Sequence, residues 1–90
     1  MLNVKHAGQN LGGTLVRLRS VFPSLKQAEA RAAAWMLDNP QEIIHMTITE
    51  LADQCGVAEA TIVRLSKKLG YNGFQDLKIA LARDLVEPLK

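Results

Sequence analysis

Cysteine, aromatic residues and long apolar runs are all scarce in this 90-residue chain. A single cysteine excludes an internal disulfide framework, so a reducing compartment such as the cytoplasm is expected. No apolar run approaches the ~20 residues that a membrane-spanning helix needs, and the first residues lack the apolar core of an export signal. Aromatic residues make up only 4% of the chain, whereas leucine, alanine and isoleucine are plentiful. This composition predicts a mostly helical cytoplasmic domain with no membrane partner.

Patterns for catalysis and for cofactor or metal binding are also missing. His6, His45 and Cys55 stand too far apart to match a metal-ligand spacing, and no nucleophile–base pair occurs at a credible spacing. The glycines before Thr14 lack the lysine and the preceding strand of a phosphate-binding loop. We therefore expect no enzyme activity, no cofactor and no metal site.

Charge is unevenly distributed, although the net charge is only +2. Residues 38–59 carry five acidic side chains and no lysine or arginine, whereas residues 60–83 carry five basic side chains and one acid. Residues 1–37 are basic as well. Such segregation can give a positive face for an anionic partner. A charged face that meets only solvent explains the same pattern, so both interpretations stay open at this point.

Start and stop signals divide the chain into about five to six helices, so the expected fold class is all-α. Leucines at helical spacing predict a first helix that begins near Leu11 and stops at Pro23, because the residue before a proline disfavours helical geometry. Ser24 and Gln27 match a capping box for a second helix. Pro40 ends that helix and opens a short helical turn.

Further caps are expected in the second half of the chain. Thr47 and Glu50 form a T-x-x-E capping box for a short helix, and Gly56 supplies the left-handed residue that ends it. Asn72 and Gln75 are expected to cap the last helix.

Residues 48–69 hold two short helices around a tight turn, which is the helix-turn-helix arrangement. At about 100° per residue, Ile62, Leu65 and Leu69 turn inward on the second helix, which is expected over residues 59–69. The positions expected to form the core of this motif are Leu51, Ala52, Cys55, Gly56, Val57, Ile62, Leu65 and Leu69.

The opposite side of the second helix is basic, with small residues near its start that permit close approach to a polyanion. Arg64 can donate two hydrogen bonds to guanine, and Thr61 can contact a base edge, a thymine methyl group or a phosphate. Lys67 and Lys68 are placed to neutralise phosphates. Glu59 can accept from a cytosine amino group, although an acid at a helix N-terminus is favourable without any partner. The candidate DNA-binding residues are Thr49, Glu59, Ala60, Thr61, Arg64, Lys67 and Lys68.

Residues 24–85 resemble the N-terminal domain of RpiR-type bacterial transcriptional regulators. The most specific pieces are the segment TITELADQCGVAEATIVRLSKKLGYNGFQDLK and the A-x3-L-x-N-P run that ends at Pro40. Two positions depart from the family pattern. Ala58 stands where a serine is usual, which removes a hydroxyl for a helix cap or a phosphate contact, and Leu65-Ser66 replaces a common Phe-Cys pair.

The resemblance implies a helix-turn-helix domain without a wing, similar to a homeodomain, over residues 10–87. The first residues show no helical periodicity, so a flexible arm is expected at residues 1–9. It implies sequence-specific binding of double-stranded operator DNA by a repressor or an activator of genes for sugar or sugar-phosphate metabolism. In that family a sugar-isomerase-like (SIS) domain follows and senses phosphorylated sugars. That domain is expected to be absent from these residues, so they should not bind the phosphosugar effector themselves.

A helical module for protein–protein interaction without DNA binding is the alternative interpretation. The last helix carries one apolar stripe for the core and a second stripe that a single small core does not need. These stripes are, in turn, Phe74, Leu77, Leu81 and Leu85, and Ile79, Ala82 and Val86. Because helix-turn-helix proteins usually read paired half-sites, the second stripe predicts a homodimer, with the leucines of the first helix as another candidate contact. Dimerisation and DNA binding can coexist.

Overall fold

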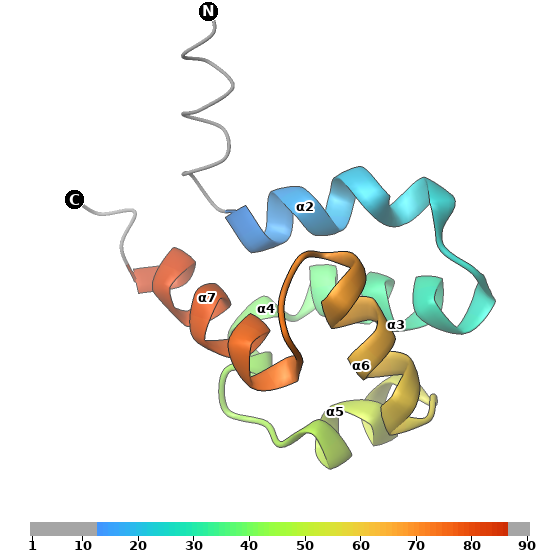
Figure 1. The fold of residues 1–90 in the computed structure, drawn as a ribbon. Coiled ribbons are helices and arrows are strands. Elements are labelled where there is room, and N and C mark those ends of the chain that lie inside the picture. The colour runs from blue at the N-terminus through green and yellow to red at the C-terminus, as the bar shows by residue number, and fades with distance from the viewer. Residues whose placement is uncertain (1–12, 87–90) are drawn as a thin grey trace, which may run out of the picture.

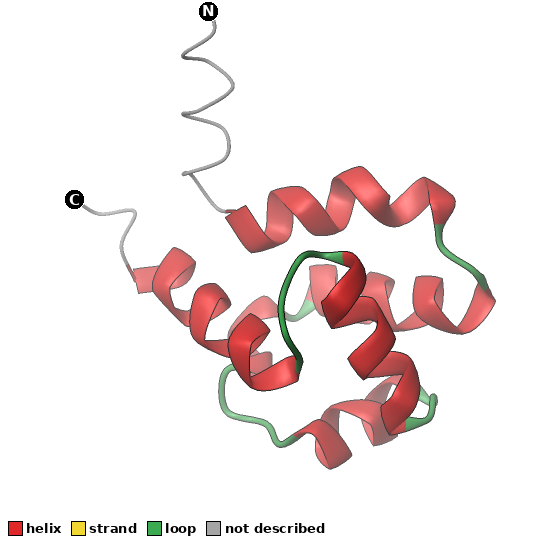
Figure 2. Ribbon diagram, in the orientation of Figure 1, coloured by secondary structure: helices red, strands yellow, loops and turns green. Residues whose placement is uncertain are grey.

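The computed structural model describes residues 13–86, and within this range it consists of helices joined by short loops (Figures 1 and 2). No strand occurs in the described part of the chain, so the all-α prediction is confirmed. None of these helices is long and apolar enough to cross a bilayer. In chain order the elements are α2 (Gly13–Val21), a 3-10 helix η1 (Phe22–Ser24), α3 (Gln27–Asp38), α4 (Pro40–Ile43), α5 (Ile48–Cys55), α6 (Glu59–Lys68) and α7 (Phe74–Val86).

One hydrophobic core joins these helices. Helix α6 packs against α3, α5 and α7, and α2 lies across α7 and α3 (Figure 1). Leu18 of α2 is fully buried and Leu15 is half-buried, so these leucines belong to the core rather than to a free surface, whereas Leu11 lies outside the described residues. The buried apolar residues are Leu18, Ala32, Ala33, Met36, Ile43, Leu51, Ala52, Cys55, Ile62, Leu65, Leu69, Phe74, Leu77 and Leu81.

The start of α3 differs from the prediction. Helix α2 ends before Pro23, as expected, but the next residues continue as η1. There the Ser24 hydroxyl donates to the Val21 carbonyl at 2.8 Å, so Ser24 does not cap α3. Helix α3 begins instead at Gln27, where the Glu29 carboxylate reaches back to the Lys26 N–H at 3.5 Å.

The caps around the helix-turn-helix follow the prediction more closely. The Glu50 N–H donates to the Thr47 hydroxyl at 3.1 Å and the Thr47 N–H donates to the Glu50 carboxylate at 2.9 Å, which confirms the capping box of α5. The predicted cap of α7 by Gln75 is wrong. The acceptor is Asp76, whose carboxylate lies 3.2 Å from the Asn72 N–H, because α7 begins at Phe74 and places Asp76 in its first turn.

Polar contacts join α2 to α7 and to the loop between α6 and α7. The Thr14 N–H donates to the Asp84 carboxylate at 2.8 Å, and the hydroxyl groups of Thr14 and Tyr71 lie 2.6 Å apart. The Arg17 guanidinium donates to the Leu69 carbonyl at 3.0 Å and lies 5.2 Å from the centre of the Tyr71 ring. Since Leu69 is the last residue of the turn that closes α6, this contact satisfies a carbonyl at the end of that helix.

Candidate nucleic-acid interface

The turn between α5 and α6 sets the angle at which the two helices cross. Gly56 adopts a left-handed conformation with φ of 70°, and its N–H donates to the Asp53 carbonyl at 3.2 Å. The Val57 N–H donates to the Ala52 carbonyl at 3.0 Å, so the last turn of α5 is closed from both residues. Arg31 of α3 donates to the Gly56 carbonyl at 3.1 Å and ties this turn to a third helix.

The inner side of α6 lies in the core. Ile62, Leu65 and Leu69 are all buried, as the angular count places them, and the buried Ser66 hydroxyl donates to the Ile62 carbonyl at 2.8 Å. Among the other expected core positions of the motif, Leu51, Ala52 and Cys55 are buried, Val57 is half-buried and Gly56 is exposed. Burial raises the pKa of the Cys55 thiol to about 11, so this thiol is neutral at neutral pH.

The outer side of α6 meets solvent. Ala60, Arg64, Lys67 and Lys68 are exposed, and the Arg64 side chain retains 59% of its accessible surface. Small Ala60 leaves the first turn of this face open, while the basic residues follow toward its end. A helix with this pattern can enter the major groove of B-DNA.

Thr61, which the sequence offers to a base edge, a thymine methyl group or a phosphate, lies beside this face and is buried. Its residue surface is only 4% exposed. Thr61, Arg64 and Lys68 follow one another at helical spacing along one flank of α6, where Arg64 and Lys68 contact Glu29 of α3. Thr61 serves there as a hydrogen-bond acceptor, with an Arg64 guanidinium nitrogen 3.4 Å from its hydroxyl.

Glu29 is the residue near this face that sequence reasoning missed. It projects from the first turn of α3, its side chain is only 5% exposed, and it binds two of the basic residues of α6. Lys68 Nζ lies 2.7 Å from Glu29 Oε1 and Arg64 Nε lies 3.5 Å from Oε2. The Lys68 hydrogen bond lowers the pKa of the Glu29 carboxyl more than burial raises it, so Glu29 is ionised at neutral pH.

Thr49 and Glu59 are brought together by the structure. The Thr49 hydroxyl donates to a Glu59 carboxylate oxygen at 2.7 Å, and both residues are exposed. This hydrogen bond joins the first turns of α5 and α6, and it engages one of the two Glu59 carboxylate oxygens.

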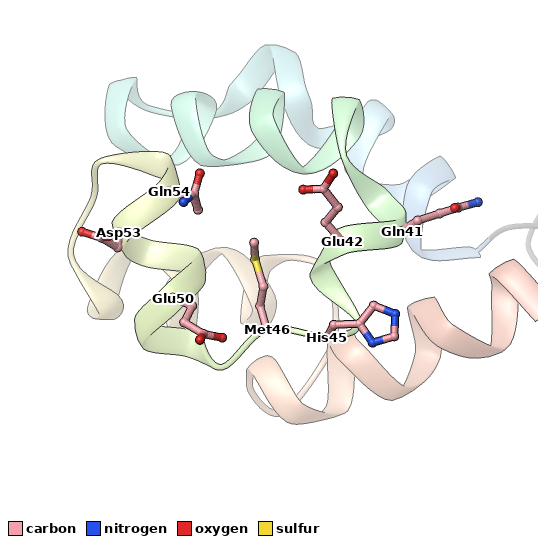
Figure 3. Close-up of a pocket in the computed structure, with 7 residues that line it drawn as sticks. All are labelled: Gln41, Glu42, His45, Met46, Glu50, Asp53 and Gln54. Carbon is pink, nitrogen blue, oxygen red and sulfur yellow. The ribbon is translucent and has the colours of Figure 1, made fainter.

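A hollow between α4 and α5 has the opposite charge to the basic outer face of α6. It has a volume of about 440 Å³, and acidic and amide side chains surround it without a lysine or an arginine (Figure 3). A groove of this charge repels the phosphates of DNA. Its lining residues are Gln41, Glu42, His45, Met46, Glu50, Asp53 and Gln54.

The fold and the basic outer face of α6 together define a DNA-binding helix-turn-helix domain. Comparison with known proteins gives the family: the model described as the helix-turn-helix domain of the rpiR family matches residues 12–88. The chain belongs to this family.

Several relatives with similar sequences are helix-turn-helix-type transcriptional regulators. A helix-turn-helix-type regulator from Caldanaerobacter subterraneus is 36% identical over 73 residues, which cover 81% of this chain and 26% of the relative. The regulator YfhH of Escherichia coli is 35% identical over 71 residues, which cover 79% of this chain and 25% of YfhH. The chain thus spans about a quarter of the length of the curated relatives it matches.

Two solved structures share the fold. The N-terminal domain of the regulator YbbH from Bacillus subtilis superposes with a TM-score of 0.80 at 35% identity, covering 86% of this chain and 94% of that structure. NanR of Vibrio vulnificus, solved in complex with ManNAc-6P, gives a TM-score of 0.80 at 38% identity and covers 84% of this chain and 29% of NanR.

Proposed function

We propose that this chain is the operator-binding domain of a bacterial transcriptional repressor or activator, and that its helix α6 reads the major groove of the operator. In this proposal the regulator acts in the cytoplasm. The observation that carries the proposal is the outer face of α6, where the exposed guanidinium of Arg64 stands between small Ala60 and Lys67. In this arrangement Arg64 contacts guanine N7 and O6, and Lys67 contacts a phosphate. Membership of the rpiR family supports DNA binding and does not favour an interaction module that binds no DNA.

The regulated genes belong, in this proposal, to sugar or sugar-phosphate metabolism. The support is the structural neighbour NanR, which was solved with the phosphosugar ManNAc-6P. The effector is sensed outside residues 1–90, because this chain matches only 29% of NanR and a quarter of the curated relatives. In this layout a helix-turn-helix domain at residues 10–87 follows an arm at residues 1–9.

The domain binds DNA as a homodimer in this proposal, and the outer side of α7 is the contact. Ile79 and Val86 are 55% and 69% exposed there, and half-buried Ala82 lies between them. Large apolar side chains that lie together on a surface favour a protein partner. Sedimentation of the wild type and of an Ile79→Ser variant, free and bound to DNA, tests the contact. A wild type that stays monomeric in both states contradicts it.

Selection of bound sites from random duplex DNA tests the proposed function. We expect one short half-site to be enriched and to recur with a fixed spacing near one helical turn, about 10 base pairs, or a multiple of it. The matched control is a selection with a variant in which Arg64 and Lys67 are both alanine. Failure of the wild type to enrich any sequence beyond this control would contradict sequence-specific binding and leave the interaction module as the better account.

A further inference from the structure

The ion-pair cluster of Glu29, Arg64 and Lys68 is unusual because its acid is nearly inaccessible while its bases lie on the proposed DNA face. The Glu29 side chain is 5% exposed, against 59% for Arg64 and 43% for Lys68. The Glu29 carboxylate belongs to the first turn of α3, where the helix dipole stabilises a negative charge. A fixed anion therefore lies beside the basic face of α6.

The cluster orients the Arg64 side chain. Its Nε faces Glu29 at 3.5 Å, and one terminal nitrogen, Nη2, lies 3.4 Å from the Thr61 hydroxyl. Among residues 13–86, no partner is found for the other terminal nitrogen, Nη1. The two inner contacts hold the side chain against the flank of α6, while the terminal end of the guanidinium stays open to a ligand. Binding costs less entropy when a long side chain is already held near its bound geometry.

The cluster also reduces the positive charge of the face. Lys68 Nζ lies 2.7 Å from the Glu29 carboxylate, so one of its three donors and much of its charge are already engaged. The strength of sequence-independent binding follows the number of phosphates that lysine and arginine neutralise. An internal anion at this place therefore weakens binding to every DNA sequence while it leaves the base-reading end of Arg64 available.

We propose that Glu29 is a specificity-determining positioning residue of operator binding: it holds Arg64 in its base-reading orientation and offsets Lys68, so that random DNA is bound less tightly. The inference rests on the proposed function, since it assumes that α6 reads DNA.

The first test compares Glu29→Gln with Glu42→Gln. Both variants raise the net charge by the same amount, but Glu42 lines the acidic hollow of Figure 3 and has no contact with α6 among the described hydrogen bonds. Affinities are measured over a salt series by fluorescence anisotropy for an operator duplex obtained by selection and for a random duplex of equal length. For Glu29→Gln we expect a salt slope on the random duplex that is steeper by about 0.9. The operator-over-random affinity ratio should fall at least about fivefold, the smallest loss expected when one bidentate base contact fails.

An unchanged ratio in Glu29→Gln, or an equal fall in Glu42→Gln, would overturn the inference. Thermal unfolding followed by circular dichroism accompanies both variants, so that a loss of fold is recognised. Glutamine keeps the shape of Glu29 and an acceptor for Lys68, which makes retention of the fold the expected result.

The second test separates orientation from charge. The double variant Glu29→Gln/Lys68→Gln restores the net charge of the wild type and still lacks the anion that holds Arg64. We expect the salt slope on random DNA to return to that of the wild type and the affinity ratio to stay low. A ratio that returns to the wild-type value would contradict the positioning role.

The third test needs no DNA. In nitrogen-15 NMR spectra the Arg64 Nε–H should exchange with water more slowly in the wild type than in Glu29→Gln, because the carboxylate shields and holds it. Equal exchange would overturn the inference even if operator binding itself is intact. A wild type that shows the slow exchange but binds operator and random duplexes equally would instead contradict the proposed function.

Discussion

On its inner side α6 buries Ile62, Leu65 and Leu69 among α3, α5 and α7, whereas on its outer side Arg64 and Lys67 meet solvent. The inner side is mainly apolar, and the buried hydroxyl group of Ser66 there bonds back to its own helix. Stability and the proposed DNA recognition therefore depend on different residues of one short helix, so each can be changed without the other.

Substitution at the inner side should have the largest effect. Ile62→Ala is expected to lower the free energy of unfolding by about 2–5 kcal/mol, because it leaves a cavity in a fully buried part of the core. The measurement is urea unfolding followed by circular dichroism. Val63→Ala, one position further and only half-buried, is the matched control and should cost much less. Equal losses in the two variants would show that the two sides are not distinct.

Substitution of Arg64 should weaken DNA binding while it leaves the free energy of unfolding nearly unchanged. Arg64→Ala is expected to weaken operator binding by about 1–3 kcal/mol and to relax the preference at one base pair, because a bidentate contact with guanine is lost. The free energy of unfolding should change far less, since the side chain is mostly exposed. Binding is measured against a panel of single-base operator variants. Arg83→Ala, an exposed arginine on α7, is the control and should leave the preference unchanged.

The parts of this comparison that depend on neighbours along the chain could be predicted from the sequence. The T-x-x-E box of α5 was predicted because its partners are three residues apart, and the left-handed Gly56 because glycine tolerates that conformation. The inward residues of α6 were predicted because a helical period alone assigns them. Ser24 was predicted wrongly because two local structures competed for it, and η1 took the residue.

The flank of α6 could not be predicted, because it depends on which helix packs there. Thr61 lies at the border of the two sides in an angular count, and only the packing of the neighbouring helices decides that it is buried. Glu29 is separated from Lys68 by 39 positions, so no periodic pattern relates them. Within the sequence it was one acid in a basic segment. The structure shows instead that this buried acid pairs with two exposed bases at the edge between the two sides.

The N-terminus of α6 lacks a side-chain cap. Ala58 occupies the capping position with extended φ and ψ, and its side chain makes no hydrogen bond. Ala58→Ser should therefore raise the free energy of unfolding by about 1 kcal/mol, because a serine hydroxyl can accept from an unpaired N–H of the first turn. Ala60→Ser, an exposed position inside the helix, is the control and should give no gain. A loss of stability in Ala58→Ser would contradict this account of the cap.

The smallest effect is expected at Lys67, which lies on the same outer side of α6 as Arg64. Lys67→Ala should weaken binding of operator and random duplexes alike, by a few-fold, and make the salt slope shallower by about 0.9, because one phosphate contact disappears. Arg19→Ala removes the same charge from an exposed position of α2 and serves as the control. A uniform loss separates Lys67, which holds the backbone, from Arg64, which reads a base. If Lys67→Ala instead changed the preferred sequence, Lys67 would read a base rather than hold a phosphate. Glu29 would then orient only one of two base-reading residues on α6.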